Sequence, residues 1–371
     1  MGFRLQRSTR LALATAALLA ILPACSPANV ANAPTAPTQP TALLSRAATA
    51  TAPPQPAATP TTAPTAPPTV APAVTSTGQP TTLPTITGQI DVASLTGRIV
   101  FAAGPQNDED IYVINADGTN LKRLTNNPGP EFDPAFSPDG MRIVYRDSRR
   151  GVNQDDEVYV MNADGSGQTN LTHNPANDWG PSWSPNGKKI VFNSDRKSRG
   201  RHLLYMMNPD GSGVQQVGDI WVEYPAWAPD GTKIAFESQE PGASGYNPDY
   251  NIYVMNPDGS GVTRLTEAPG QDVAPAWSPD GKKILFTSTR DNEILPGNLA
   301  PLPDIWVMNA DGSGQTRLTR SGGEYAAWSS DGKYIVFGGD RLYVMNADGS
   351  NITPLPINSL TGYRWFPNWT R

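Results

Sequence analysis

Short apolar runs recur along the chain, and each one predicts a buried β-strand. Five of them begin with isoleucine and carry an aromatic residue two positions later: Ile143-Val-Tyr145, Ile190-Val-Phe192, Ile234-Ala-Phe236, Ile284-Leu-Phe286 and Ile335-Val-Phe337. Ile99-Val100-Phe101 is a sixth copy. A continuous run of β-branched and aromatic residues is typical of a strand that is covered on both faces.

A second pattern surrounds each run. A segment ending in an aromatic residue precedes it, and a tight turn joins the two. The segments are Pro134-Ala-Phe136, Pro181-Ser-Trp183, Pro225-Ala-Trp227, Pro275-Ala-Trp277 and Ala326-Ala-Trp328, and the turns are Pro138-Asp-Gly140, Pro185-Asn-Gly187, Pro229-Asp-Gly231, Pro279-Asp-Gly281 and Ser330-Asp-Gly332. Asp-Gly and Asn-Gly supply the positive φ that hairpins need. An alternating third strand follows, as in Ile252-Tyr-Val254.

The motif Asn-x-Asp-Gly closes each unit before a fourth strand. It occurs six times, at Asn115, Asn162, Asn208, Asn256, Asn309 and Asn346. The copies lie roughly 40 to 50 residues apart, which is the length of a four-stranded propeller blade. Loops of variable length, where function usually resides, join the second and third strands: Arg146–Asp156, Asn193–Arg201, Glu237–Tyr250 and Thr287–Pro303.

The two ends of the folded region indicate how the ring closes. It opens with a second-strand motif at Ile99, and the chain finishes with a first-strand motif, Pro367-Asn-Trp369. The C-terminal strand can therefore complete the N-terminal blade and leave no open edge. The sequence predicts an all-β, six-bladed β-propeller over residues 89–371 with mixed N-/C-terminal strand closure.

The first 24 residues predict a signal peptide. Arg4, Arg7 and Arg10 precede the apolar stretch Leu11–Leu22, which is too short to span a bilayer comfortably. Leu22-Pro-Ala-Cys25 then resembles the lipobox of bacterial lipoproteins, and Cys25 is the only cysteine in the chain. This resemblance implies acylation at Cys25 and stable membrane anchoring. Ordinary secretion is the alternative.

Residues 25–88 are predicted to be a disordered tether. From Ser26 to Gly88 the chain is rich in Pro, Thr and Ala, and Arg46 is its only charged residue. Such a segment cannot bury enough apolar surface to fold. All 34 acidic residues follow Gly88, so the folded region is net acidic. This argues against nucleic acid as a partner.

The repeat resembles that of a known family. Pro275-Ala-Trp-Ser-Pro-Asp-Gly-Lys-Lys-Ile284, followed by Ile305-Trp-Val-Met-Asn-Ala-Asp-Gly312, is similar to the WD-like repeat of the TolB propeller. The likeness implies a protein partner at one face of the propeller. TolB proteins carry an α/β domain before their propeller, where this chain has the Pro/Thr/Ala segment.

Acidic and aromatic residues just before the inner strands predict a binding site at the mouth of the central channel. The predicted site residues are Glu131, Phe132, Asp178, Trp179, Glu223, Tyr224, Asp272, Glu324, Tyr325 and Trp365, with Trp221 and Phe366 nearby. Such a mouth could take a basic peptide segment, a cation or a sugar face. We expect Trp179, Tyr325 or Trp365 to Ala to weaken binding. In the alternative interpretation the aromatic residues pack between blades and the acids are solvated.

Catalysis is less well supported by the sequence. It has no Gly-x-Ser-x-Gly, His-Glu-x-x-His or P-loop motif. Its two histidines are His173 at a blade junction and His202, which opens a third strand away from the predicted mouth. A binding module is favoured, and a glycan-active lyase or hydrolase that uses mouth carboxylates is the alternative.

No cofactor is predicted, although Ca²⁺ in the channel stays open as an alternative. The repeated Asp-Gly residues are interpreted as turn chemistry, since Ca²⁺ needs six or more oxygens. We expect a monomer of the bacterial cell envelope, in the periplasm or at the cell surface, whose partners are a protein or cell-wall ligand and the membrane through its lipid anchor.

Overall fold

The computed structural model describes residues 89–148, 155–197, 200–239, 249–290, 302–357, 360, 362 and 364–370. The predicted signal peptide (1–24), Cys25 and the predicted tether (to 88) lie outside the described residues, as do the middle parts of the four variable loops. Within the described ranges, no helix is long and apolar enough to cross a lipid bilayer.

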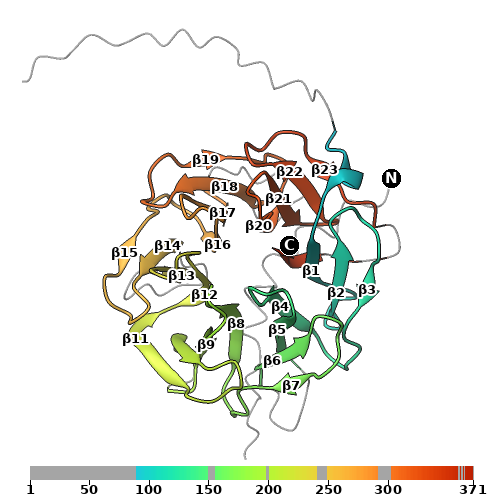
Figure 1. Cartoon of the computed structure of the whole chain (residues 1–371). Coiled ribbons are helices and arrows are strands. Elements are labelled where there is room, and N and C mark those ends of the chain that lie inside the picture. The colour runs from blue at the N-terminus through green and yellow to red at the C-terminus, as the bar shows by residue number, and fades with distance from the viewer. Residues whose placement is uncertain are drawn as a thin grey trace, which may run out of the picture. The chain divides into compact units, whose positions relative to one another are not determined.

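The described residues form six four-stranded antiparallel sheets (Figure 1). Blade 1 contains β24 (Arg364–Thr370), β1 (Arg98–Ala103), β2 (Asp110–Asn115) and β3 (Lys122–Arg123); blade 2 contains β4 (Glu131–Phe136), β5 (Arg142–Asp147), β6 (Glu157–Asn162) and β7 (Thr169–Asn170); blade 3 contains β8 (Asp178–Trp183), β9 (Ile190–Ser194), β10 (Leu203–Met207) and β11 (Gln215–Trp221).

The second half of the ring repeats this order. Blade 4 contains β12 (Glu223–Trp227), β13 (Ile234–Gln239), β14 (Tyr250–Met255) and β15 (Thr263–Arg264); blade 5 contains β16 (Asp272–Trp277), β17 (Lys283–Ser288), β18 (Asp304–Asn309) and β19 (Thr316–Arg317); blade 6 contains β20 (Glu324–Trp328), β21 (Tyr334–Gly338), β22 (Tyr343–Asn346) and β23 (Thr353–Pro354). A short 3₁₀ helix, η1 (Val92–Ser94), precedes β1.

The six blades close into a ring, and this confirms the predicted fold. The inner strands contact one another in the cyclic order β24, β4, β8, β12, β16, β20 and back to β24. They surround the centre of the ring in Figure 1. The last strand, β24, pairs antiparallel with β1, with Ile99 opposite Trp369 and Val100 opposite Asn368. The two ends of the folded region therefore share blade 1.

The hydrophobic core lies in the seams between blades. Val144 of β5 packs with Ile190 and Phe192 of blade 3. Its neighbours on the same strand, Ile143 and Tyr145, pack instead with residues of blade 1. Successive side chains of a strand point to opposite faces, so each second strand contributes to two seams. This explains why these strands are apolar at every position.

The repeated Asp-Gly motifs form hydrogen-bonded hairpin turns. In blade 4 the Asp258 carboxylate accepts hydrogen bonds from the backbone N–H of Ser260 at 2.9 Å and from its hydroxyl at 2.6 Å. These bonds lower the pKa of Asp258. Gly259 has φ +86° and lies against the backbone of Gly218. The same carboxylate-to-Ser/Thr bonds occur in all six copies. The interpretation as turn chemistry accounts for them.

Asp258→Ala should therefore lower the thermal midpoint of unfolding slightly, by about 2 °C, because one turn loses its side-chain bonds. The shift should be the same with or without a chelator, since these carboxylates act on backbone and hydroxyl groups. Differential scanning calorimetry measures both, with the exposed Glu267→Ala as control. A midpoint that fell on chelation in the parent but not in the variant would instead indicate a metal at the turn.

Candidate functional site

A β-bulge interrupts the inner strand of every blade. The register shifts within each inner pairing, and the residue at the shift has positive φ. These residues are Asp133, Gly180, Tyr224, Ala274, Tyr325 and Phe366. Five of the six are not glycine, so the backbone conformation is held by the fold rather than by local preference. Bulges re-aim side chains next to functional sites, and here one bulge residue per blade borders the channel.

The five predicted acids fall into two structural positions. Glu131, Asp178 and Asp272 lie two residues before the bulge, opposite Asp147, Ser194 and Ser288 of the second strands. Glu223 and Glu324 lie one residue before it, opposite Glu237 and Gly338. Neighbouring residues of a strand point to opposite faces. The prediction of a single acidic ring is therefore wrong.

All five acids are also buried, contrary to both sequence interpretations. Glu131, Asp178 and Asp272 are 0% exposed, and Glu223 and Glu324 are 8% exposed. Burial raises the pKa of Glu131 and of Glu324 to about 8, and that of Asp178 to about 6. The predicted site acids thus belong to the interior of the blades.

Arginine clamps hold two of these acids. Arg196 donates to the Asp178 carboxylate at 2.9 Å and to the Ser194 hydroxyl at 2.9 Å. In blade 5, Arg290 donates to Asp272 in the same way, and the Ser288 hydroxyl donates to Asp272 at 2.6 Å. In both blades the arginine follows the second strand by two residues. In each of these blades the clamp holds the start of the inner strand against the end of the second strand.

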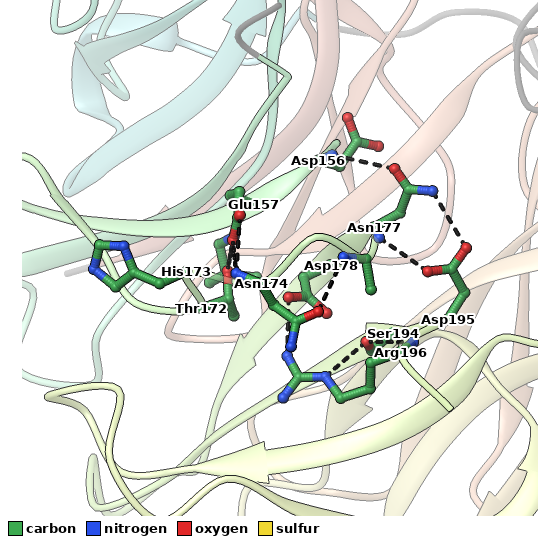
Figure 2. Close-up of polar contacts among 12 residues, drawn as sticks. Asp156, Glu157, Thr172, His173, Asn174, Asn177, Asp178, Ser194, Asp195 and Arg196 are labelled. Atoms are coloured by element: carbon green, nitrogen blue, oxygen red, sulfur yellow. Dashed lines mark hydrogen bonds and ion pairs between the residues drawn. The ribbon is translucent and has the colours of Figure 1, made fainter. Parts of the chain in front are cut away.

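The linker between blades 2 and 3 is braced from several sides (Figure 2). The Asn177 side chain accepts from the Asp156 backbone at 3.2 Å, and the Asn177 backbone donates to Asp195 at 2.9 Å. Glu157 accepts from Thr172 and from the Asn174 backbone. The His173 ring extends away from these contacts in Figure 2 and is exposed. This segment is therefore a rigid connection, with His173 at the surface.

His202 lies beside the predicted mouth residues, and its expected separation from them is wrong. Its ring packs against Trp179 and Trp221, with centroids 4.5 and 4.2 Å away. Its Nδ1 lies 2.9 Å from Glu223, which also accepts from the Trp221 indole at 2.9 Å. The Tyr250 hydroxyl donates to the same carboxylate at 3.3 Å. Three side chains, those of His202, Trp221 and Tyr250, therefore contact one oxygen of Glu223 in the seam between blades 3 and 4.

This packing also decides the position of Trp179. Its ring packs on His202 and only 3% of its surface is exposed, so Trp179 is a seam residue. We therefore expect Trp179→Ala to act on stability rather than directly on binding.

Aromatic rings from four blades meet in the channel. Phe366 of blade 1 lies 4.0 Å from Tyr325 of blade 6 and 5.7 Å from Tyr224 of blade 4, between ring centroids. Phe132 of blade 2 lies 6.2 Å from Phe366, and Trp365 lies 5.8 Å from Tyr325. Blades 1 and 4 lie on opposite sides of the ring, so these side chains reach across it. We call Phe132, Tyr224, Tyr325, Trp365 and Phe366 the channel aromatic cluster. All five are half-buried.

A charged group borders this cluster. The Asp133 carboxylate accepts from the Gly180 backbone at 3.3 Å and lies 3.8 Å from Arg146. Arg146 contacts Asp156 at 3.3 Å and lies over the Phe132 ring at 5.0 Å. Burial raises the pKa of Asp133 to about 6. Sequence reasoning missed Asp133, although its place directly before Pro134 matches that of Tyr224 before Pro225.

Glu237 is a second buried acid near the channel that the sequence did not single out as a site residue. It lies opposite Glu223 in the sheet, and its carboxylate accepts from the Ala274 backbone of blade 5 at 2.6 Å. Burial and the neighbouring Glu223 raise its pKa. Glu237 thus ties blade 4 to the bulge of blade 5. Nowhere in the described ranges do three His, Cys, Asp or Glu side chains gather as a metal-binding group.

The comparisons with known proteins agree with this geometry. Residues 93–219 match the family described as tricorn protease N-terminal β-propeller domain, and residues 219–337 match the TolB β-propeller domain. A TolB homolog of Chlorobium luteolum is 33% identical over 58 residues, which is 16% of this chain and 13% of that protein. The Tol-Pal system protein TolB of Bordetella pertussis is 40% identical over 45 residues, 12% of this chain and 10% of that protein. The chain thus spans a small part of these relatives.

Solved structures share the fold. TolB from Acinetobacter baumannii superposes with a TM-score of 0.61 at 21% identity, over 74% of this chain and 66% of that one. A putative TolB from Agrobacterium tumefaciens gives a TM-score of 0.54 at 19% identity, over 74% and 99% of the two chains. The sequence repeat, the closed ring and these likenesses agree. The folded part of this chain is a six-bladed β-propeller that is similar in fold to TolB, and its residues 219–337 match the TolB β-propeller domain.

Proposed function

We propose that this protein is a lipid-anchored binding module of the bacterial cell envelope that docks a protein, or a cell-wall ligand, at the channel aromatic cluster. The observation that carries the proposal is the convergence of five half-buried aromatic side chains from four blades. Aromatic side chains clustered at the centre of a patch dominate the binding energy of many interfaces. Tyr and Trp combine a large apolar area with few rotatable bonds.

The scaffold around the cluster supports this function. Tyr224, Tyr325 and Phe366 stand on bulges within inner strands, and each inner strand is hydrogen-bonded into a four-stranded sheet. A site on such a rigid frame loses little conformational entropy when a partner binds. The cluster is therefore organised before binding.

Sequence features support the location. The signal-like segment, the lipobox-like Leu22–Cys25 and the uncharged tether all precede the propeller. Several relatives are named as Tol-Pal system proteins. We infer that Cys25 carries the lipid and that the tether holds the propeller away from the membrane. Metabolic labelling with a palmitate analogue, lost in Cys25→Ser, tests the anchor.

Glycan chemistry fits the geometry less well. It needs two carboxyl groups that flank the scissile bond and that the substrate can reach. Glu223 is engaged by His202, Trp221 and Tyr250, and Glu237 is engaged by the Ala274 backbone. The half-buried groups at the channel are aromatic, which favours binding.

The binding function is tested by affinity capture with the full chain in detergent. We expect a partner from envelope extract to bind the parent and to be lost, at least tenfold, with Tyr325→Ala combined with Trp365→Ala, since each removes a large contact area. The control combines Met141→Ala with Val262→Ala, because these exposed apolar residues lie in the turns. A partner that both variants retain would contradict the site, and one that both lose would indicate general surface hydrophobicity.

A further inference from the structure

We propose that the channel contains a site for an organic cation, in which the Asp133 carboxylate receives a guanidinium or ammonium group that lies against the rings of Tyr224, Tyr325 and Phe366. This inference deepens the proposed function, because it names the chemical group that a partner would insert. It rests on the proposed function only for the source of the cation. Four features of the described residues support the site.

The first observation is an unsatisfied carboxylate oxygen. Asp133 is 6% exposed. Its Oδ2 accepts from the Gly180 backbone at 3.3 Å, whereas its Oδ1 is buried and has no hydrogen-bond partner in the described part of the chain. Buried polar atoms are nearly always paired, and an unpaired one costs free energy. A donor that arrives with a ligand would remove this cost.

The second observation is that the nearest cation is engaged elsewhere. Arg146 approaches Asp133 only to 3.8 Å, beyond hydrogen-bond distance. Its Nε lies 3.3 Å from Asp156 and donates to the Ser148 hydroxyl at 3.3 Å. Its guanidinium also lies over the Phe132 ring. Two carboxylates thus share one guanidinium, and Asp133 has the weaker contact.

The third observation is that the channel aromatic cluster adjoins Asp133, which directly follows Phe132 in the chain. Tyr224 and Phe366 are stacked at 5.7 Å, and Tyr325 lies 4.0 Å from Phe366. Gly180, whose backbone N–H donates to Asp133, lies beside Tyr224, because a Cβ at Gly180 would be 3.7 Å from the Tyr224 Cα. Aromatic faces attract organic cations, most strongly when the cation is desolvated. A carboxylate beside several rings is the arrangement that such a ligand requires.

The fourth observation separates an organic cation from a metal ion. Ca²⁺ takes six to eight oxygen ligands. The described residues contain no group of three acidic, histidine or cysteine side chains that could hold a metal. One carboxylate with three rings suits a guanidinium or an ammonium group.

The experiment titrates the full chain in detergent with ethylguanidinium and with tetramethylammonium, by calorimetry. Neutral molecules of similar shape, N-ethylurea and tert-butanol, and CaCl₂ are titrated in parallel. We expect the two organic cations to bind and the neutral molecules to bind at least roughly tenfold more weakly. Asp133→Asn should weaken cation binding roughly tenfold, because the carboxylate charge is lost.

The matched control is Asp139→Asn in the same blade. Asp139 is an exposed turn residue that accepts from the Met141 backbone and the Ser137 hydroxyl. Blade 3 has Asn186 at this position with the equivalent bonds. This variant should bind the cations within about twofold of the parent. If Asp133→Asn fails to fold, Tyr325→Leu keeps the carboxylate, removes a ring and should weaken binding severalfold.

Several results would overturn the proposal: unchanged cation binding in a folded Asp133→Asn protein or in Tyr325→Leu, equal binding of the neutral molecules, or binding of Ca²⁺ alone. If a partner is captured, saturating ethylguanidinium distinguishes two sources of the cation. The partner should be released when one of its own side chains supplies the cation. The partner should stay bound when the natural ligand of the site is a small molecule. Cation binding without any captured partner would support this site and contradict the proposed function. A captured partner without cation binding would support the proposed function and contradict this site.

Discussion

Replacing Glu324 with Gln should stabilise the propeller at alkaline pH and leave its stability unchanged in acid. Glu324 is 8% exposed, and among the described residues no hydrogen bond or ion pair to its carboxyl group lowers its pKa. Desolvation alone raises its pKa to about 8, from an ordinary value of 4.5. The folded protein therefore holds a proton on Glu324 in a pH range where the unfolded chain has lost it.

The sign of the effect follows from this difference. A group whose pKa is raised on folding contributes stability that is fully present below its unfolded pKa and is lost as the pH rises through its folded pKa. For Glu324 this window runs from about 4.5 to about 8. At about 1.4 kcal/mol per pH unit, the loss is on the order of 3 to 5 kcal/mol by pH 9. Gln remains neutral throughout and avoids it.

Urea denaturation of parent and variant at pH 4.5, 6, 7.5 and 9 measures the difference. The pKa of Glu131 is also raised to about 8, so Glu131 gives both proteins a similar dependence of stability on pH. The difference between the two curves of unfolding free energy against pH therefore isolates Glu324. The exposed Glu267→Gln is the control and should follow the parent. Parallel curves for parent and Glu324→Gln would show that Glu324 is ionised in the folded state at neutral pH.

Truncating Trp369 should cost about 3 to 5 kcal/mol of unfolding free energy, as for other buried large aromatic residues. Trp369 lies on the C-terminal strand β24 and is 8% exposed. Its indole donates to the Thr96 carbonyl at 3.0 Å, and its ring stacks on Tyr334 of blade 6 at 6.5 Å. Trp369→Ala removes contacts to both the N-terminal segment and the neighbouring blade, and so weakens the closure of the ring.

Chemical denaturation followed by tryptophan fluorescence and by circular dichroism measures this loss. Ile352→Ala is the control, since Ile352 is 38% exposed on the outer part of blade 6 and should change the stability by less than about 0.5 kcal/mol. A separate early transition in Trp369→Ala would indicate that blade 1 opens before the rest. A loss below about 1 kcal/mol would show that closure does not depend on this side chain.

The sequence alone determined the fold because the repeat encodes it locally. The buried runs at Ile143 and Ile190, the Asp-Gly turns and the six Asn-x-Asp-Gly motifs all specify strands and hairpins from adjacent residues. Ring closure followed as well, since the first-strand motif at Trp369 has its partner at Ile99. These signals depend on side-chain period and turn chemistry, which are properties of short segments.

Only the tertiary structure decided the site. Whether Glu223 aligns with Asp178 depends on one residue of register around a bulge, and a shift of one residue reverses the face of the strand. Asp178 lies three residues before its proline and Glu223 lies two residues before its own. This difference indicates opposite faces of the strand only when the position of the bulge is known. The partners of each acid come from other strands: Arg196 for Asp178, and His202 of the preceding blade for Glu223.

The same reason separates Trp179 from Tyr325. Both are aromatic residues at the start of an inner strand, yet one packs on His202 in a seam and the other meets Phe366 across the channel. The sequence determined that these strands form and in what order they surround the channel. Burial and electrostatic environment are set by contacts between blades far apart in the chain, and so only the assembled ring decided which side chains could meet a ligand.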